Sequence, residues 1–233
     1  MRITYVDEAT LEGLSQADLA VANRIRARRA PGPLQALDLA LLHSPAVADG
    51  WSSFLASIRT ETTLPAAIRE LLICRVAVIN SAWYEWDDHA PLAMQAGLSV
   101  EAMDLLKKKD LKNVDKTQQV RAGLTDKDWA ALVLTDEMTQ NVKVRRETFC
   151  ELQMHFGERE LVEIIATISC YNCVSRFIVA FNSKTPILTS KYIEWFLSVV
   201  IALTLLIVGE KNDEGFDVSQ DCYTAESPQT AYY

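Results

Sequence analysis

Residues 64–99 read LPAAIRELLICRVAVINSAWYEWDDHAPLAMQAGLS and predict two consecutive helices. Pro65 suits the first turn of a helix, where its missing N–H costs nothing. A strong apolar face at helical spacing then continues through about Asn80, made by Ile68, Leu71, Leu72, Val76 and Ile79. A second helix is expected from about Ala82 to Ala96, because Gly97 is typical of the position just beyond a helix end.

The second of these helices carries two side chains suited to proton transfer. Glu85 and His89 are four residues apart, so they share one helical face. Trp86 lies on a nearby flank, where its ring could supply a dry wall. In an apolar pocket, burial raises the pKa of a carboxyl group, and a neighbouring carboxylate favours the charged imidazole. Such a pair can move protons near neutral pH without a cofactor.

Glu70, on the first helix, is the third candidate catalytic residue. A carboxylate in so apolar a helix needs a partner or a function, and Glu70 would approach Glu85 and His89 if the two helices pack antiparallel. The surrounding pocket is expected to include Cys74 and the aromatic residues Trp83, Tyr84 and Trp86. The competing interpretations are a core position for Cys74 and a solvated surface pair for Glu85 and His89.

Helical patterns also flank this stretch on both sides. Apolar residues recur at helical spacing over 34–43, 46–58, 126–139, 142–156 and 158–181. Thr125 with Asp128 resembles a capping box. The sequence shows no strict alternation of a half-buried strand, and its eight Gly and seven Pro are few for a β-sandwich or barrel. We therefore predict an all-α fold with antiparallel helix packing.

The two ends of the chain differ in composition from this region. Residues 1–33 are polar and predict an N-terminal arm with one short helix, followed by a helical domain over 34–185 in which 110–124 form a polar connector. Residues 186–209 predict an apolar C-terminal helix, and 210–233 a disordered acidic and polar tail.

The uncharged run at 195–209 has 15 residues, whereas a membrane span usually needs about 20. A buried or amphipathic helix is therefore favoured over a membrane tether, which stays the alternative.

Charge and cysteine content restrict the class of protein. The formal net charge of −8 argues against a general nucleic-acid binder, which needs clustered Lys and Arg. The basic run from Arg24 to Arg29 is interpreted as a solvated helix face or part of the arm. The five cysteines are odd in number and irregularly spaced, and the first residues are polar and acidic rather than a secretory signal. Reduced thiols and a cytoplasmic location are expected.

The stretch at 64–99 resembles the core motif of the carboxymuconolactone decarboxylase and AhpD-like superfamily. The resemblance is best over 64–106 and looser over 34–63 and 125–182. It implies an all-α fold that assembles as a homo-oligomer and acts on a small molecule.

The candidate residues match that superfamily only in part. In AhpD-like peroxidases, a Glu, a Cys-x-x-Cys pair and a His four residues after the second Cys form a thiol proton relay. Glu70 matches the Glu and His89 the His, but Ala82 and Glu85 occupy the two cysteine positions. A Glu in place of the second Cys is similar to the decarboxylase branch, which works on lactone acids without a metal or organic cofactor.

The resemblance thus implies a cofactor-independent acid–base enzyme that acts by decarboxylation or a related proton-transfer step. Its substrate would be a small carboxylated lactone or aromatic-derived metabolite, in aromatic catabolism or the tailoring of secondary metabolites. In this hypothesis His89 polarises a carbonyl, Glu85 returns a proton to carbon, and Glu70 orients the imidazole.

Two other functions stay open. One is an AhpD-like thiol peroxidase with displaced cysteines, at Cys74 or at the Cys170 and Cys173 pair, although that pair lies mid-helix, where core cysteines are expected. The other is a non-catalytic helical oligomer that binds a metabolite or partner. A separation of more than about 8 Å between Glu70 and His89 would favour it, because proton transfer needs contact or one bridging water.

Overall fold

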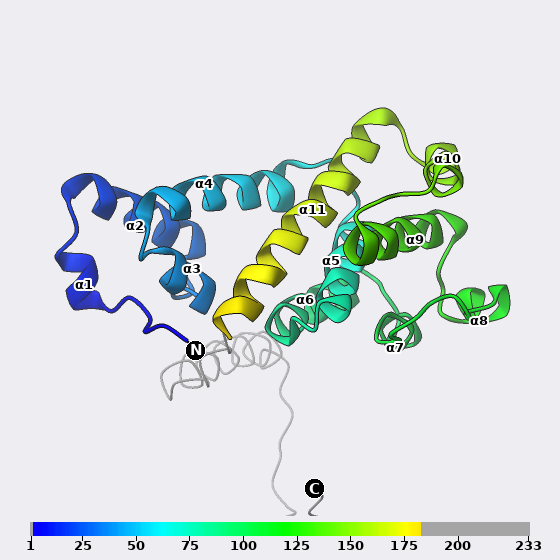
Figure 1. Ribbon diagram of the computed structural model, residues 1–233, viewed down its shortest axis with the longest axis horizontal. Helices are drawn as coiled ribbons and strands as arrows, with labels where there is room; N and C mark the ends of the chain where they lie inside the picture. Colours follow the sequence, from blue (N-terminus) through cyan, green and yellow to red (C-terminus); the bar gives the residue numbers. More distant parts are fainter. Residues whose placement is uncertain (1, 183–233) are drawn as a thin grey trace, which may run out of the picture. The chain divides into compact units, whose positions relative to one another are not determined.

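The structure, a computed structural model, describes residues 2–182, and every regular element among them is a helix (Figure 1). In chain order these are α1 (Glu8–Glu12), α2 (Gln16–Arg29), α3 (Ala36–Leu41), α4 (Pro45–Ala56), the π-helix η1 (Ser57–Glu61), α5 (Ala66–Ile79), α6 (Trp83–Gln95), α7 (Val100–Leu106), α8 (Lys116–Arg121), α9 (Asp126–Asn141), α10 (Arg146–His155) and α11 (Glu158–Phe181). The predicted all-α fold is confirmed. The chain divides into two units, 1–186 and 187–233, and the predictions for 186–209 and 210–233 lie outside the described residues.

Helix α5 is the centre of the described fold. Its most extensive contacts are with α6, α9 and α11, which surround it in Figure 1. Ten of its residues are buried, namely Ile68, Glu70, Leu71, Leu72, Ile73, Cys74, Arg75, Val76, Ala77 and Val78. A helix that is covered on all sides needs apolar residues all round, which explains the nearly continuous apolar run in this part of the sequence.

A tight turn reverses the chain between α5 and α6. Ser81 adopts a left-handed conformation with φ 54°. Its N–H donates to the carbonyl of Val78 at 3.1 Å, and the N–H of Ala82 donates to the carbonyl of Ala77 at 2.8 Å. These two bonds form a Schellman motif, which satisfies the last carbonyls of α5. Helix α6 can therefore begin at once and pack antiparallel against α5, as the sequence predicts.

The N-terminal segment packs into the fold through two helices, α1 and α2, where the sequence predicts an arm with one short helix. Its buried apolar residues are Leu11, Val21, Ala22 and Ile25. Ion pairs at 2.6–2.7 Å hold its basic run to acidic residues elsewhere, namely Arg24 to Asp49, Arg26 to Glu8 and Arg29 to Asp38. Because the partners in these ion pairs are far apart in the sequence, no local sequence pattern predicts the contacts. Helix α8 similarly forms inside 110–124, where a connector is expected.

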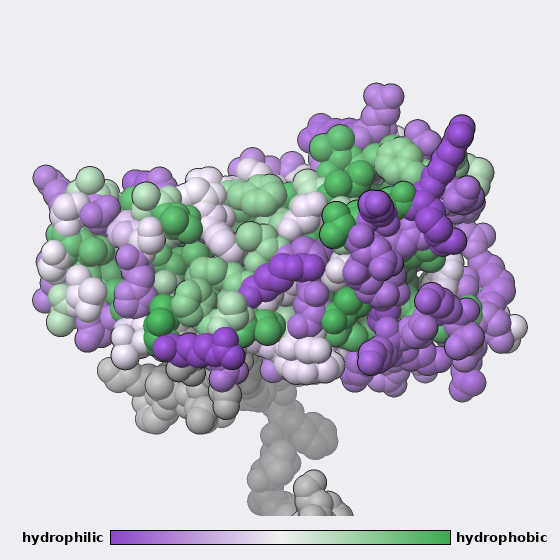
Figure 2. All heavy atoms as spheres, in the orientation of Figure 1, coloured by the Kyte–Doolittle hydropathy of each residue, from purple (hydrophilic) through white to green (hydrophobic). Residues whose placement is uncertain are grey.

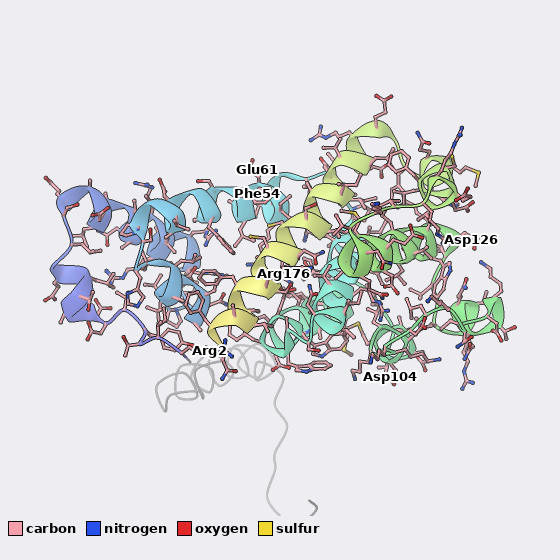
Figure 3. All side chains as sticks on the ribbon, viewed as in Figure 1. Arg2, Phe54, Glu61, Asp104, Asp126 and Arg176 are labelled. Atoms are coloured by element: carbon pink, nitrogen blue, oxygen red, sulfur yellow. The ribbon has the colours of Figure 1, made fainter. Side chains whose placement is uncertain are left out.

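Helix α11 joins the N-terminal helices to the rest of the described fold. Arg2, labelled in Figure 3, donates from its backbone N–H to the carbonyl of Phe181 at 2.8 Å and from its guanidinium to Ala180 at 2.9 Å. Among residues 2–182, α11 is the one helix long and apolar enough to cross a membrane. Nine of its residues are buried in the fold, so burial accounts for its apolar character. On the face shown in Figure 2, hydrophilic side chains mainly cover the region of α7 to α10.

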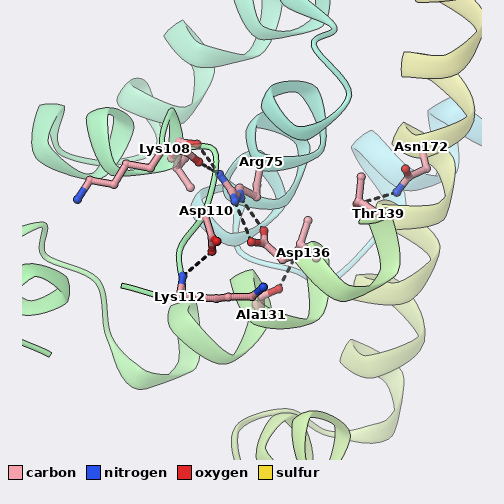
Figure 4. A network of polar contacts seen from close by, with 10 residues as sticks. Arg75, Lys108, Asp110, Lys112, Ala131, Asp136, Thr139 and Asn172 are labelled. Carbon is pink, nitrogen blue, oxygen red and sulfur yellow. Dashed lines mark hydrogen bonds and ion pairs between the residues drawn. The ribbon is translucent and has the colours of Figure 1, made fainter. Parts of the chain in front are cut away.

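Arg75 connects α5 to α9 and to the segment after α7 by a buried polar network (Figure 4). Its side chain is fully buried and binds both carboxylate oxygens of Asp136, at 2.6 and 2.8 Å. Its Nη1 also donates to the carbonyls of Leu106 at 2.8 Å and Lys108 at 2.5 Å. All these bonds depend on one guanidinium, so its loss would leave a carboxylate and two carbonyls without their partner.

We predict that Arg75→Met lowers the free energy of unfolding by about 3–5 kcal/mol, as expected when one member of a buried ion pair is removed. Urea denaturation followed by circular dichroism measures this change. The control is Asp104→Ala, which removes an exposed ion pair with Lys107 and should cost less than about 1 kcal/mol. Similar losses for the two variants would contradict a stabilising role for the network.

Candidate active site

Glu70 and His89 form a buried contact between α5 and α6. The Nδ1 atom of His89 lies 2.6 Å from Oε2 of Glu70. The two residues are only 4% exposed each. Arg69 holds the other carboxylate oxygen of Glu70, with 3.3 Å between Nε and Oε1. The antiparallel turn thus brings together two residues that are 19 positions apart in the sequence.

The surroundings of this pair fix its protonation. Burial raises the pKa of Glu70, but the hydrogen bond from His89, together with Arg69, outweighs burial and leaves that pKa below its ordinary value. Burial lowers the pKa of His89, and the positive charge of Arg59 adds to this effect against the opposing influence of Glu70. We conclude that a neutral imidazole donates Nδ1–H to the Glu70 carboxylate. Nε2 of His89 is then a proton acceptor.

Glu85 lies on the same face of α6 but has a different environment. Its residue exposure is 2%, and neither carboxyl oxygen has a hydrogen-bond partner among the described residues. Burial raises its pKa well above the ordinary value, the negative charge of Asp88 adds to this, and Arg59 opposes it. The surroundings of Glu85 therefore favour the protonated acid, whereas those of Glu70 favour the carboxylate.

Glu85 and His89 line one cavity of about 30 Å³. Its apolar wall consists of Leu37, Leu55, Val174 and Ile178, and the other lining residues are Arg29, Gln35, Arg59, Tyr84, Glu85, Asp88, His89 and Tyr171. Glu70 lies behind the imidazole and outside this lining. A cavity of this size holds about one water molecule, so a larger ligand can bind only if the lining elements move apart.

Of the three aromatic residues predicted to line the pocket, one lines the cavity and two do not. Tyr84 lines the cavity. Trp83 is 53% exposed, and Trp86 packs against Trp83 and under Lys107 instead of lining the cavity. On the helix, Trp86 lies about 100° from Glu85 on the side opposite to Tyr84, and Trp83 lies about 200° from Glu85. The predicted pocket positions of Trp83 and Trp86, and the dry wall expected from Trp86, are therefore corrected, because aliphatic residues of other helices form the apolar wall.

Tyr171 and Arg59 also line the cavity, although neither is predicted from the sequence. Tyr171 of α11 is 1% exposed, its hydroxyl has no partner among the described residues, and its ring meets the His89 ring edge-on with centroids 5.1 Å apart. Its helical spacing with Ile168, Val174 and Ile178 marks an inward position and could have revealed it. Arg59 of η1 lies with its Nη2 atom 3.4 Å from Nε2 of His89, and no local pattern distinguishes it.

The four cysteines of residues 2–182, Cys74, Cys150, Cys170 and Cys173, lie outside the cavity lining. Cys74 is fully buried, and burial raises the pKa of its thiol, with the negative charge of Glu70 adding to the effect. Burial likewise raises the pKa of Cys170 to about 12, and Cys173 is an exposed free thiol. High thiol pKa values oppose thiolate formation, which a peroxidatic cysteine requires. Within residues 2–182, no group of His, Cys, Asp and Glu side chains is arranged to hold a metal ion.

Comparisons with known proteins agree with this arrangement. Residues 45–106, which include Arg59, Glu70, Glu85 and His89, match the carboxymuconolactone decarboxylase family. No curated protein matches the chain.

Solved structures share the fold at low sequence identity. An AhpD-core, peroxidase-related protein from Ralstonia eutropha JMP134 has a TM-score of 0.62 and 13% identity, covering 82% of this chain and 93% of that chain. The debrominase Bmp8, solved with 2,3,4-tribromopyrrole, has a TM-score of 0.59 and 14% identity, covering 80% and 92%.

A third structure is that of an Agrobacterium tumefaciens protein of unknown function, suggested to be the antioxidant defence protein AhpD. It has a TM-score of 0.54 and 22% identity, covering 64% of this chain and 96% of that chain. Residues 45–106 of the chain thus match the carboxymuconolactone decarboxylase family, and its helical fold is similar to that of AhpD-like proteins.

Proposed function

We propose that this protein is a cofactor-independent acid–base enzyme that decarboxylates a small carboxylated lactone or related aromatic-derived metabolite. The observation that carries the proposal is the unpartnered carboxyl group of Glu85, which is 2% exposed and lines the same cavity as His89. Two carboxyl groups held in opposite protonation states around one imidazole are the arrangement that acid–base enzymes use. The match of residues 45–106 to the carboxymuconolactone decarboxylase family supports an enzyme of this kind.

The proposed reaction assigns one task to each group. The bond between a substrate carbon and its carboxylate breaks, and carbon dioxide leaves. The bonding electron pair moves into a conjugated carbonyl, which becomes an enolate. Glu85 then gives its proton to the carbon, and the electron pair returns from oxygen. Glu85 recovers a proton from water, which His89 can relay through Nε2. Glu70 keeps the imidazole in the required tautomer.

This assignment changes one role proposed from the sequence. A neutral imidazole whose Nδ1–H is held by Glu70 offers a lone pair, not a proton, at Nε2. His89 is therefore proposed to accept and relay protons, and another group must stabilise the enolate. Assembly of the protein as a homo-oligomer stays a prediction.

An assay against a panel of carboxylated lactones and aromatic acids tests the function directly. Release of carbon dioxide, measured with the purified full-length protein and without added metal or cofactor, is the expected result. If no member of the panel loses carbon dioxide, the assignment as a decarboxylase of this substrate class is wrong.

We predict that His89→Ala lowers turnover by roughly 100-fold or more, as expected for loss of an acid–base group. The matched control is His155→Ala, because His155 also contacts a glutamate, Glu151, at 3.2 Å but lies on α10, outside the cavity lining. Steady-state kinetics on the active substrate measures both variants. Equal activity of His89→Ala and the wild-type protein would exclude His89 from the reaction.

We also predict that Glu85 makes folding stability fall as the pH rises. Above pH 4.5, the ordinary pKa of glutamate, the unfolded chain releases this proton while the folded protein keeps it. The free energy of unfolding then decreases with pH. The Glu85→Gln variant lacks this proton, so its advantage over the wild-type protein should grow from mildly acidic to neutral buffer.

Urea denaturation across that pH range measures the difference, and the exposed Glu12→Gln variant is the control. A constant difference between Glu85→Gln and wild type would mean that Glu85 is already ionised in the folded protein.

A further inference from the structure

Arg59 is a cation without an acidic partner in the cavity. None of the ion pairs at 4.0 Å or less among residues 2–182 includes it, and its recorded hydrogen bond is the long 3.4 Å contact with Nε2 of His89. Arg29 lines the same cavity, but Asp38 binds its guanidinium at 2.7 and 3.0 Å. The two cavity arginines therefore differ, because Asp38 neutralises the charge of Arg29, whereas the charge of Arg59 has no carboxylate within ion-pair distance.

The π-helix η1 determines where Arg59 points. Hydroxyl groups in this segment bond to carbonyls four residues earlier, from Ser57 to Ser53 at 3.3 Å and from Thr60 to Ala56 at 2.7 Å. Such bonds compete with the backbone N–H groups for the same carbonyls and weaken the α-helical pattern. The wider π turn then carries the side chain of Arg59 into the cavity, consistent with the frequent occurrence of π-helical turns at functional sites.

The hydroxyl group of Tyr171 is a second hydrogen-bond donor in the lining of the same cavity. Its hydroxyl is buried and has no partner among the described residues, and burial raises the pKa of Tyr171, so the phenol keeps its proton. A buried hydroxyl without a partner costs free energy that a bound ligand can recover. Arg59 and Tyr171 together offer N–H and O–H groups where His89 offers only an acceptor.

We propose that Arg59 and Tyr171 form an oxyanion-binding site that stabilises the enolate oxygen of the substrate. The inference rests on the proposed function and narrows the substrate class to acids whose carboxyl-bearing carbon is conjugated to a carbonyl. As the carbon–carboxylate bond breaks, its electron pair moves onto the carbonyl oxygen, which Arg59 and Tyr171 then hold. Carbon dioxide leaves as a neutral molecule, and Glu85 protonates the carbon.

The positions of polar and apolar residues in the cavity favour this orientation of the substrate over one in which the leaving carboxylate binds Arg59. A cation bound to the leaving carboxylate would stabilise the substrate more than the transition state and slow the reaction. The aliphatic residues Leu37, Leu55, Val174 and Ile178 provide a wall of low polarity. A carboxylate against that wall is poorly solvated, whereas the enolate charge develops beside the donors.

Ligand binding tests the site without any turnover. Tetronate is a lactone that carries a stable enolate and no carboxylate, and an unsubstituted butenolide is its neutral counterpart. In titration calorimetry, we expect the wild-type protein to bind tetronate at least about 10-fold more tightly than the butenolide, because charge-assisted hydrogen bonds are the stronger kind. Arg59→Gln should reduce this preference to within about 2-fold, and Arg59→Lys should restore part of it.

Two further variants complete the binding test. Tyr171→Phe removes only the hydroxyl and should weaken tetronate binding several-fold, whereas the surface variant Arg24→Gln should bind like the wild-type protein. The proposal is overturned if wild-type protein does not prefer tetronate, or if the preference survives in Arg59→Gln.

Kinetic measurements then test the oxyanion-binding site and the proposed decarboxylation independently. On a substrate that releases carbon dioxide, Arg59→Gln should lower kcat by roughly 100-fold with a smaller change in KM, because the charge forms only in the transition state. If no substrate is found but tetronate binding depends on Arg59, the proposed function fails and the oxyanion site stands. If carbon dioxide is released but tetronate is not preferred, the function stands and this inference fails.

Discussion

The hydrogen bond between His89 and Glu70 is the constraint on which the rest of the site depends. It joins two antiparallel helices at 2.6 Å, and it determines which nitrogen of the imidazole is available to a ligand. The backbone turn at Ser81 makes this contact possible, because α6 begins directly after α5 and returns along it. A longer connection would leave the register of the two helices undetermined and the imidazole free to choose its tautomer.

This hydrogen bond also determines which hydrogen-bonding groups the cavity offers to a ligand. With Nδ1 committed to Glu70, the imidazole shows the cavity a lone pair. Donors must then come from elsewhere, and the lining groups that carry the proposed chemistry are the carboxyl group of Glu85, the phenol of Tyr171 and the guanidinium of Arg59. They are drawn from three separate helices, so no single element of the chain contains the chemistry.

The sequence predicts those parts of the site that depend on local spacing. The helices α5 and α6, the helix end at Gly97 and the capping box at Thr125 all follow from patterns a few residues long, and the structure contains them. The 24 residues of α11 were expected over the same range, 158–181. The approach of Glu70 to His89 could also be foreseen, because two adjacent antiparallel helices have few possible registers.

Other parts of the site could not be predicted because they depend on distant partners. Helix α2 contacts other parts of the chain through ion pairs such as that between Arg29 and Asp38, which no local sequence pattern predicts. Arg59 lies in a π turn, which a search for a 3.6-residue period does not find. The predicted pocket positions of Trp83 and Trp86 are wrong because closeness to Glu85 in the sequence does not decide which residues line one cavity.

The residues that line the cavity come only in part from the family segment. Arg29, Gln35 and Leu37 lie before residue 45, where the family segment begins, whereas the acid, the imidazole and the guanidinium of Arg59 lie inside that segment. Substitutions in the first helices can therefore change the shape of the cavity without replacing Arg59, Glu85 or His89. The selectivity of the cavity for a ligand can thus be altered separately from the polar groups at its base.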